Sequence, residues 1–230
     1  MKVIPSNVIK DWFEEDYSHS MDDSIYGNSP EALIFFFNLL AKDNKVRKIL
    51  ELGCGDGRNL LELAKKGFEV TGIDLYGKKT VEARAKKHSV NINFIKADIT
   101  KYDFGSNKYD ALISSEVFNL IEQKFLSNLL TKSKLALTTG GYIYISILSN
   151  IERFFLSTKE RFIFDDLPDY SNEQSFEVLK NEFSDWRVIK LDKFHFEWEW
   201  PIDKNKIHKY PIEPYYGKGD YVYLIAKKRN

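Results

Sequence analysis

The stretch Lys48-Ile-Leu-Glu-Leu-Gly-Cys-Gly-Asp-Gly-Arg58 decides the fold of this chain. It begins with apolar residues typical of a short buried strand and then places glycines at 53, 55 and 57. A helix-compatible segment, Asn59 to Lys66, follows at once. Strand, glycine turn and helix in this order build a ligand cradle at the carboxyl end of the first strand of an α/β sheet. Glycine is needed because the backbone turns sharply and lets a ligand come closer than a Cβ would permit.

Composition narrows the class of protein. The 230 residues fit one α/β domain with modest additions, and 43% hydrophobic with 30% charged residues is ordinary for a globular protein. Lys+Arg and Asp+Glu both total 34, so net charge supplies no attraction to nucleic acid or to an anionic membrane. The single cysteine, Cys54, excludes an internal disulfide, and no metal-ligand spacing is present. With no signal core and no apolar run of membrane length, we expect a cytoplasmic protein.

Strands alternate with helices through the first two thirds of the sequence. Patterns of apolar residues predict strands at 48–52, 68–74, 91–96, 109–114 and 142–148, with helices between them. This alternation predicts βαβ units and a mainly parallel sheet. A capping box at Ser171-Asn-Glu-Gln174 predicts a helix to about Glu182. The strand-like segments 186–200 and 221–226 have no helix between them, which favours an antiparallel hairpin at the sheet edge.

The chain is expected to form a single domain over residues 1–230, in three parts. An irregular arm at 1–28 precedes the ligand-binding core at 29–148, which opens with a helix at Ser29-Pro30. The C-terminal part, 149–230, shows no clear period over 149–170 and then contributes the helix and hairpin. Its loop 201–220 is longer than a packing connection needs, so we expect it to act as a lid over the substrate.

The residues around the glycine turn indicate which nucleotide it binds. A dinucleotide fingerprint requires glycine at the position that Arg58 occupies. Glu51, two residues before the first glycine, would repel a pyrophosphate but suits a ligand that carries an ammonium and a sulfonium. Asp74 closes the second strand and can accept hydrogen bonds from ribose hydroxyls, and Asp98 closes the third and can bond an adenine amino group. These features point to S-adenosylmethionine, whereas a purely structural glycine turn is the simpler alternative.

The motif set resembles the class I S-adenosylmethionine-dependent methyltransferases over about residues 45–148. The matching residues are Glu51-Leu-Gly-Cys-Gly-Asp-Gly57, Asp74, Ala97-Asp98-Ile99 and the Gly140-Gly141 turn. The resemblance implies a Rossmann-like three-layer α/β sandwich, whose seven-stranded, mostly parallel sheet has an antiparallel last strand. It also implies a set of residues that contact the cofactor. The expected cofactor-binding residues are Glu51, Gly53, Cys54, Gly55, Gly57, Asp74, Leu75, Asp98, Ile99, Ser114 and, from the arm, Tyr17.

Within that class, Gly-Asp-Gly-Arg-Asn59 and the short C-terminal part are similar to the tellurite-resistance type and related small-molecule methyltransferases. Members of that type carry a His-Arg pair in the C-terminal segment. The counterpart here is His195-Phe196, which lacks the arginine. We therefore expect a methyltransferase that acts on a small molecule and releases S-adenosylhomocysteine, with no nucleic-acid partner.

Two side chains are candidates for acid–base chemistry. A hydroxyl or protonated amine acceptor needs a general base, whereas a thiolate hardly needs one. Glu116 lies in the segment after the fourth strand, which faces the transferred methyl in this class; its alternative role is that of a solvated carboxylate at a helix start. His195 lies in an aromatic stripe, where a structural role is the alternative. Arg84, in a basic helix with several lysines, is expected on a solvated face.

Other functions remain open at this point. A protein or RNA methyltransferase would be favoured by a basic patch beside the pocket. A nicotinamide-dependent oxidoreductase would bind NAD more tightly than S-adenosylmethionine. A catalytically silent module would bind the cofactor but close the pocket around the methyl group. The sequence does not indicate the acceptor or the oligomeric state.

Overall fold

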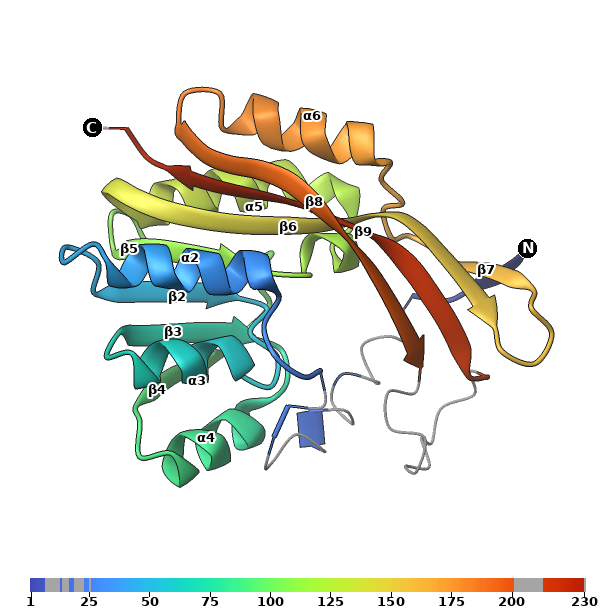
Figure 1. Ribbon diagram of the computed structural model, residues 1–230, viewed down its shortest axis with the longest axis horizontal. Coiled ribbons are helices and arrows are strands. Elements are labelled where there is room, and N and C mark those ends of the chain that lie inside the picture. Colours follow the sequence, from blue (N-terminus) through green and yellow to red (C-terminus); the bar gives the residue numbers. More distant parts are fainter. Residues whose placement is uncertain (7–12, 14–16, 19–22, 25, 201–212, 230) are drawn as a thin grey trace.

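The computed structural model describes residues 1–6, 13, 17–18, 23–24, 26–200 and 213–229. A central sheet lies between two layers of helices (Figure 1). The helices are α2 (Glu31–Ala41), α3 (Arg58–Lys65), α4 (Lys78–Lys87), the short 3-10 helix η1 (Phe118–Leu120), α5 (Gln123–Ala136) and α6 (Asn172–Glu182). The strands are β1 (Lys2–Ile4), β2 (Lys48–Leu52), β3 (Glu69–Asp74), β4 (Ile92–Lys96), β5 (Tyr109–Ser114), β6 (Leu137–Phe155), β7 (Arg161–Phe164), β8 (Arg187–Trp200) and β9 (Tyr215–Lys227).

Seven of these strands form the predicted sheet. They run in the spatial order β4-β3-β2-β5-β6-β9-β8, and the first five are parallel to their neighbours. Strand β9, the last in the chain, is antiparallel to both β6 and β8. The Rossmann-like, mostly parallel sheet with an antiparallel last strand is therefore confirmed. The strand boundaries at 48–52 and 109–114 agree with those predicted.

The structure extends this sheet beyond the prediction. Strand β6 continues past 148 to Phe155 and pairs with β7, which pairs in turn with β1. Figure 1 shows β6, β8 and β9 running past the ends of β2 and β3 and curving, with β7 and β1 at the far tip. A register shift between Ser149 and Glu152 breaks the period-two alternation, so the second half of β6 leaves no regular pattern in the sequence.

The hairpin of β8 and β9 forms as predicted, but β9 begins earlier. Because β9 starts at Tyr215, the prediction of a lid loop over residues 201–220 is wrong for residues 215–220. Residues 201–212 of that predicted loop lie outside the described residues. This part of the strand could not be predicted from its residue types, because it contains Gly217 and Gly219 and glycine is uncommon in strands. The space over Gly217 is filled by Trp198, whose ring lies 2.2 Å from where a Cβ would stand.

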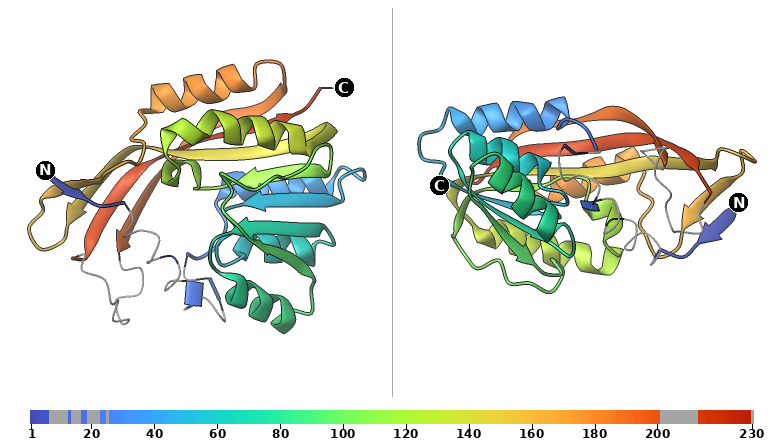
Figure 2. Two further views of the ribbon diagram at one scale, coloured as in Figure 1. Left: turned by 180° about the vertical axis from the view of Figure 1, so that it is seen from behind. Right: turned by 90° about the horizontal axis from the view of Figure 1, so that it is seen from below.

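Two apolar clusters fix the helices to the two faces of the sheet. On one face, α2 and α3 pack on β2 and β5; on the other, α5 and α6 pack on β5, β6 and β9 (Figure 2). The apolar side chains Leu33, Phe36, Phe37 and Leu40 of α2 are buried against the sheet. Among the described residues, none of the helices has the length and apolar character needed to cross a membrane.

Candidate active site at the carboxyl ends of the parallel strands

The central strands bring the expected site residues to one edge of the sheet. Strand β2 lies between β3 and β5, with Leu52 opposite Ile73 and Glu51 opposite Ile113. The backbone N–H of Gly53 donates to the carbonyl of Ile73 at 2.8 Å, which joins the glycine turn to the end of β3. Residues just beyond each strand end therefore lie close together.

Two glycines of the turn have backbones and surroundings that only glycine fits. Gly53 has a φ of +64°, and a Cβ there would lie 2.4 Å from a methyl of Val117. Gly55 has a φ of +53°, and its Cβ would lie 3.0 Å from the ring of Tyr17. Both angles fall in the left-handed region that side chains disfavour. The turn is thus a cradle of bare backbone.

Glu51 is the unusual group beneath this cradle. Its side chain is buried, and Oε1 accepts a hydrogen bond from Asn59 Nδ2 at 2.6 Å. Among the described residues, Oε2 has no hydrogen-bond partner. Burial raises the pKa of Glu51 to about 8, although the Asn59 bond and the charge of Arg58 act in the opposite direction. A buried carboxyl with an unsatisfied oxygen is costly, and an ammonium group placed there would satisfy it.

Asp74 ends β3 and supports the glycine turn. Its Oδ2 accepts from the backbone N–H of Gly55 at 2.8 Å and its Oδ1 from that of Tyr76 at 3.0 Å. Burial raises the pKa of Asp74, and hydrogen bonds from the backbone N–H groups of Tyr76, Gly55 and Leu75 partly offset this effect. Each carboxylate oxygen has a second lone pair, so both can still accept from a pair of ligand hydroxyls.

The predicted adenine contacts lie next to Asp74, after β4. The backbone N–H of Ala97 donates to the Asp74 carbonyl at 3.0 Å, which places Asp98 at the same edge. Partial burial opposes ionisation of Asp98, but bonds from Thr100 and Lys101 outweigh it and hold its pKa below the usual value. Ile99 is buried in the core, and the exposed Leu75 directly follows Asp74.

Glu116 reaches the same edge from the end of β5. Its φ of +64° is strained for a side-chain-bearing residue, and its N–H donates to Ser146 Oγ on β6 at 3.0 Å. Its carboxylate forms an ion pair with Arg58, with Nη2 and Oε1 3.2 Å apart. The hydroxyls of Ser114 and Ser115, just before it, have no partner among the described residues. Such strain typically occurs at functional positions.

Two buried tyrosines lie within electrostatic reach of Glu116. Burial, followed by the charge of Glu116, raises the pKa of Tyr144 on β6 and that of Tyr221 on β9. Arg58 acts in the opposite direction on both hydroxyls. Glu116, Arg58, Tyr144 and Tyr221 therefore form a cluster beside the cradle, and we call it the Glu116 cluster.

The N-terminal arm contributes Tyr17, which is buried against Gly55. Thr80 on α4 donates its hydroxyl to the carbonyl of Tyr17 at 2.5 Å. Burial, followed by the charge of Asp74, raises the pKa of Tyr17 well above its usual value. This part of the arm thus lies directly over the glycine turn.

His195 is not brought to this site. It lies opposite Asp220 in the pairing of β8 with β9. Its Nδ1 forms a hydrogen bond with a carboxylate oxygen of Asp220 at 3.0 Å, and its Nε2 forms one with Glu197 at 3.2 Å. Asp220 also accepts from Asn172 on α6, so this network faces α6. The neighbouring pair Phe194 and Tyr221 points to the other face of the sheet. His195 and Glu116 therefore lie on opposite faces.

Several contributors to the site gave no clear signal in the sequence. Asn59, which bonds Glu51, also accepts from Ser29 Oγ at 2.6 Å, so Ser29 does not cap α2. Arg84 is wrongly expected on a solvated face: it is buried and pairs with Asp56 of the glycine turn at 3.5 Å. The asparagine two residues after the last glycine of the turn is the signal that could have found the Asn59 contact; Arg84 lies on another helix, and the sequence gave no signal for its contact.

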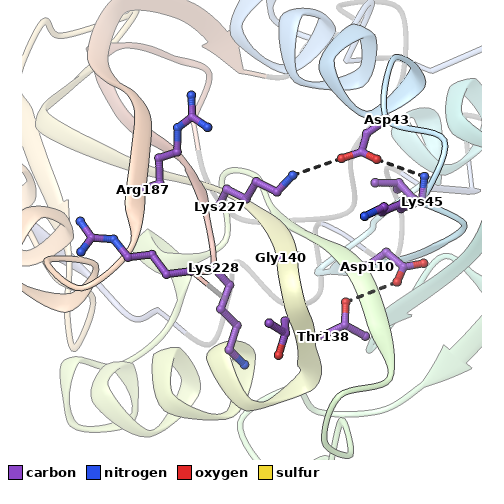
Figure 3. Close-up of a pocket in the computed structure, with 12 residues that line it drawn as sticks. Asp43, Lys45, Asp110, Thr138, Gly140, Arg187, Lys227 and Lys228 are labelled. Carbon is purple, nitrogen blue, oxygen red and sulfur yellow. Dashed lines mark hydrogen bonds and ion pairs between the residues drawn. The ribbon is translucent and has the colours of Figure 1, made fainter.

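A separate pocket lies at the opposite, amino-terminal ends of the parallel strands (Figure 3). Its volume is about 410 Å³, and basic side chains such as Arg187 and Lys228 line it. Its two carboxylates already have partners: Asp43 pairs with Lys227 at 3.2 Å, and Asp110 accepts two backbone N–H groups. Because ligands of such sheets bind at the carboxyl ends of the strands, we assign this pocket no catalytic role.

Known proteins are similar to this chain in sequence. Residues 49–141 match the family described as a methyltransferase domain. The ubiquinone biosynthesis O-methyltransferase of Rickettsia conorii is 32% identical over 124 residues, 52% of this chain and 41% of that protein. The probable S-adenosyl-L-methionine-dependent methyltransferase TehB of Haemophilus influenzae is 26% identical over 189 residues, 80% of this chain and 57% of that protein. The chain thus spans about half the length of these relatives.

Solved structures share the fold. The crystal structure of Haemophilus influenzae TehB gives a TM-score of 0.67 at 19% identity and covers 94% of this chain and 67% of that one. The structure of a Burkholderia thailandensis 1,6-didemethyltoxoflavin-N1-methyltransferase, with bound 1,6-didemethyltoxoflavin and S-adenosylhomocysteine, gives a TM-score of 0.63 at 15% identity. The match covers 98% of this chain and 89% of that one. Residues 49–141 therefore match a methyltransferase domain, and the resemblance to the class I S-adenosylmethionine-dependent methyltransferases is confirmed. TehB resembles it through both the core and the C-terminal part.

The buried carboxyl of Glu51 predicts a specific dependence of stability on pH. Its pKa is about 8 in the folded protein against 4.5 ordinarily, so the native state keeps a proton that the unfolded chain loses. The free energy of unfolding should therefore fall between about pH 5 and pH 8, by up to about 1.4 kcal/mol per pH unit. Urea denaturation across this range should show a shallower fall in Glu51→Gln.

The matched control is Glu62→Gln, because Glu62 is a glutamate on the solvent side of α3. It should retain the pH dependence of the wild type. A Glu51→Gln variant whose stability follows that of the wild type at every pH would show that Glu51 is not protonated in the folded protein.

Proposed function

We propose that this protein is an S-adenosylmethionine-dependent methyltransferase that methylates a small-molecule acceptor. The observation that carries the proposal is the buried Glu51, whose unsatisfied oxygen lies beneath a turn of bare glycine backbone. The ammonium of the cofactor's methionine part fits this oxygen in charge and in hydrogen-bonding capacity. A pyrophosphate, by contrast, brings negative charge and would only hold Glu51 in its neutral form, so it offers the buried carboxyl no compensating cation; this argues against NAD.

The remaining groups fit the other parts of the cofactor. Asp74 would accept from the ribose hydroxyls, while Asp98 and the backbone of Ile99 would meet the adenine, with Leu75 packing beside it. Tyr17 and the arm would cover the bound nucleoside, and Ser114 would line its methionine end. In this arrangement Cys54 is a small buried residue whose pKa is raised well above the usual value by burial, so it is not a thiolate nucleophile.

When bound, the cofactor supplies a methyl group already activated by the positive sulfur. The chain holds the acceptor in line with that methyl and excludes water, which lowers the barrier by several kcal/mol. The bond from the methyl to the acceptor forms as the bond to sulfur breaks, leaving S-adenosylhomocysteine. Glu116 would accept the acceptor's proton, while Arg58 orients its carboxylate at 3.2 Å.

A small acceptor is favoured over a macromolecule. The relatives and structural neighbours include methyltransferases whose names specify ubiquinone biosynthesis and 1,6-didemethyltoxoflavin. The basic pocket in Figure 3 lies at the end of the sheet away from the cradle, so it would not guide a nucleic acid to the cofactor. The protein or RNA methyltransferase, the oxidoreductase and the silent module therefore lack a specific observation in their favour.

Cofactor binding tests the proposal first. Calorimetry should detect binding of S-adenosylmethionine and S-adenosylhomocysteine and no comparable binding of NAD. Asp74→Ala should weaken both by at least about a hundredfold, because it removes ribose contacts as well as support for the turn. A thermal scan and the milder Asp74→Asn variant separate lost contacts from lost folding. Failure of the wild type to bind S-adenosylmethionine would sink the proposal.

Catalysis is tested through Glu116. Labelled-methyl transfer to hydroxyl acceptors should fall by about a hundredfold or more in kcat in Glu116→Gln, with the affinity for S-adenosylmethionine unchanged. Glu122→Gln, which alters an exposed carboxylate six residues later, should keep full activity. Equal rates in the Glu116→Gln variant and the wild type would remove Glu116 from the mechanism.

A further inference from the structure

The pocket drawn in Figure 3 is a cavity that the proposed methyl transfer does not use. Its volume of about 410 Å³ falls within the range of small-molecule sites. The loop after α2, the start of β6, the start of β8 and the end of β9 form its walls. Strand β5 runs from this end of the sheet to Ser114, and its six residues span about 17 Å. The pocket is therefore separate from the glycine turn.

Positive charge dominates the lining of this pocket. Five of the lining side chains are basic and two are carboxylates, so cations exceed carboxylates by three. Over the whole chain Lys+Arg and Asp+Glu are equal, at 34 each, so this excess is local. Such a concentration of one sign in a concave site attracts counter-ions. The basic lining residues are Lys45, Arg187, Lys227, Lys228 and Arg229.

The two carboxylates of the pocket are already satisfied. Asp43 accepts from the ammonium of Lys227 at 3.2 Å and from the hydroxyl of Tyr142 at 2.8 Å. A backbone N–H and then the Tyr142 hydroxyl hold the pKa of Asp43 below its usual value. Asp110 accepts from two backbone N–H groups, each at 2.9 Å. Neither carboxylate therefore neutralises the other cations of the pocket.

Most of these cations lack an anion. Among the described residues, the side chains of Lys45, Arg187 and Arg229 form neither an ion pair nor a hydrogen bond. The ammonium of Lys228 donates to two backbone carbonyls, at 2.8 and 3.0 Å, which fixes its position and leaves its charge uncompensated. One exposed cation is well solvated by water, but four around one cavity repel one another. A bound anion removes this repulsion.

The pairing of β8 with β9 places two cations directly opposite each other. Arg187 is the register partner of Lys227, so the two side chains share one face of the sheet, with Cβ atoms about 5 Å apart. Figure 3 shows them on neighbouring strands, with Lys227 turned toward Asp43. Like charges in this position destabilise a sheet. An anion beside Arg187 turns the unfavourable pair into a binding site.

The number and type of cations indicate the chemical class of the anion. Two phosphate groups carry about three to four negative charges at neutral pH, which matches the excess of three cations. The planar guanidinium of Arg187 can donate two parallel hydrogen bonds to phosphate oxygens, and a lysine such as Lys45 acts as a point charge. A single phosphate or carboxylate leaves part of the excess unpaired.

We propose that this pocket binds the diphosphate group of a small molecule. The inference goes beyond the proposed function, because the pocket holds neither the cofactor nor the methyl acceptor. Free pyrophosphate and a nucleoside diphosphate present the same group. Arg187 and Lys45 are the residues that recognise it.

Calorimetry with pyrophosphate, ADP and inorganic phosphate tests the assignment. Pyrophosphate should bind with one site per chain and at least about tenfold more tightly than inorganic phosphate, because the second phosphate adds charge-assisted bonds. Arg187→Gln should weaken pyrophosphate binding about tenfold, and Arg187→Gln with Lys45→Gln about a hundredfold. If ADP binds more tightly than pyrophosphate, the source is a nucleotide; if more weakly, it is free pyrophosphate. Both results support the site.

The chain offers a matched control. Lys190→Gln removes a cation of β8 that lies outside the pocket, three residues or about 10 Å beyond Arg187. At physiological salt this exceeds the screening length of about 8 Å, so the affinity for pyrophosphate should stay within about twofold of the wild type. Arg187→Lys should keep part of the affinity, because it keeps the charge without the planar fork. Without ligand, Arg187→Gln should melt no lower than the wild type, since a like-charge pair is removed.

Three results would overturn the inference. They are the absence of pyrophosphate binding in the wild type, an unchanged affinity in the double variant, and tighter binding of a 20-nucleotide single-stranded RNA than of either diphosphate. Saturation with S-adenosylhomocysteine should leave pyrophosphate binding unchanged, and displacement would locate the anion at the glycine turn instead. A wild type that binds pyrophosphate but not S-adenosylhomocysteine would refute the proposed function and leave this site intact.

Discussion

A carboxyl group buried at the end of the central strand is the constraint on which the rest of the site depends. Glu51 is held by Asn59 and surrounded by glycine backbone, and no cation of the described chain pairs with it. Its pKa of about 8 means that at neutral pH it is mostly a neutral acid with one unsatisfied oxygen. Apolar residues would pack there at lower cost. The arrangement is consistent with a site built for a ligand that brings a positive charge.

Glu116 is held beside the cradle by a residue of the glycine turn itself. Its ion pair with Arg58 and its strained backbone hold the carboxylate in one orientation. Arg58 directly follows Gly57, the last glycine of the turn. The turn that would bind the cofactor and the candidate base are therefore linked through one side chain.

The cradle and the parallel core could be predicted from local sequence patterns. The rest of the fold could not, because it depends on pairing between strands that lie far apart in the sequence. The alternation of strands and helices, the glycine spacing and the carboxylates after each strand are local features, and the fold they predict is confirmed by the sheet order. Three features depend on contacts that no local pattern reveals: the pairing of β1 with β7, the second half of β6 and the start of β9. The second half of β6 follows a register shift, and the start of β9 contains Gly217, which lies under the ring of Trp198. The position of His195 could not be predicted, because an aromatic stripe in the sequence does not show which face of a hairpin its polar residues occupy.

Proton release on cofactor binding tests the central claim most directly. Calorimetric titration with S-adenosylhomocysteine at pH 7, in buffers of different ionisation enthalpy, counts the protons exchanged. If the ligand's ammonium pairs with Glu51, the carboxyl must ionise, and binding should release close to about one proton in the wild type and none in Glu51→Gln. Absence of binding, or binding with the same proton exchange in both proteins, would contradict the account.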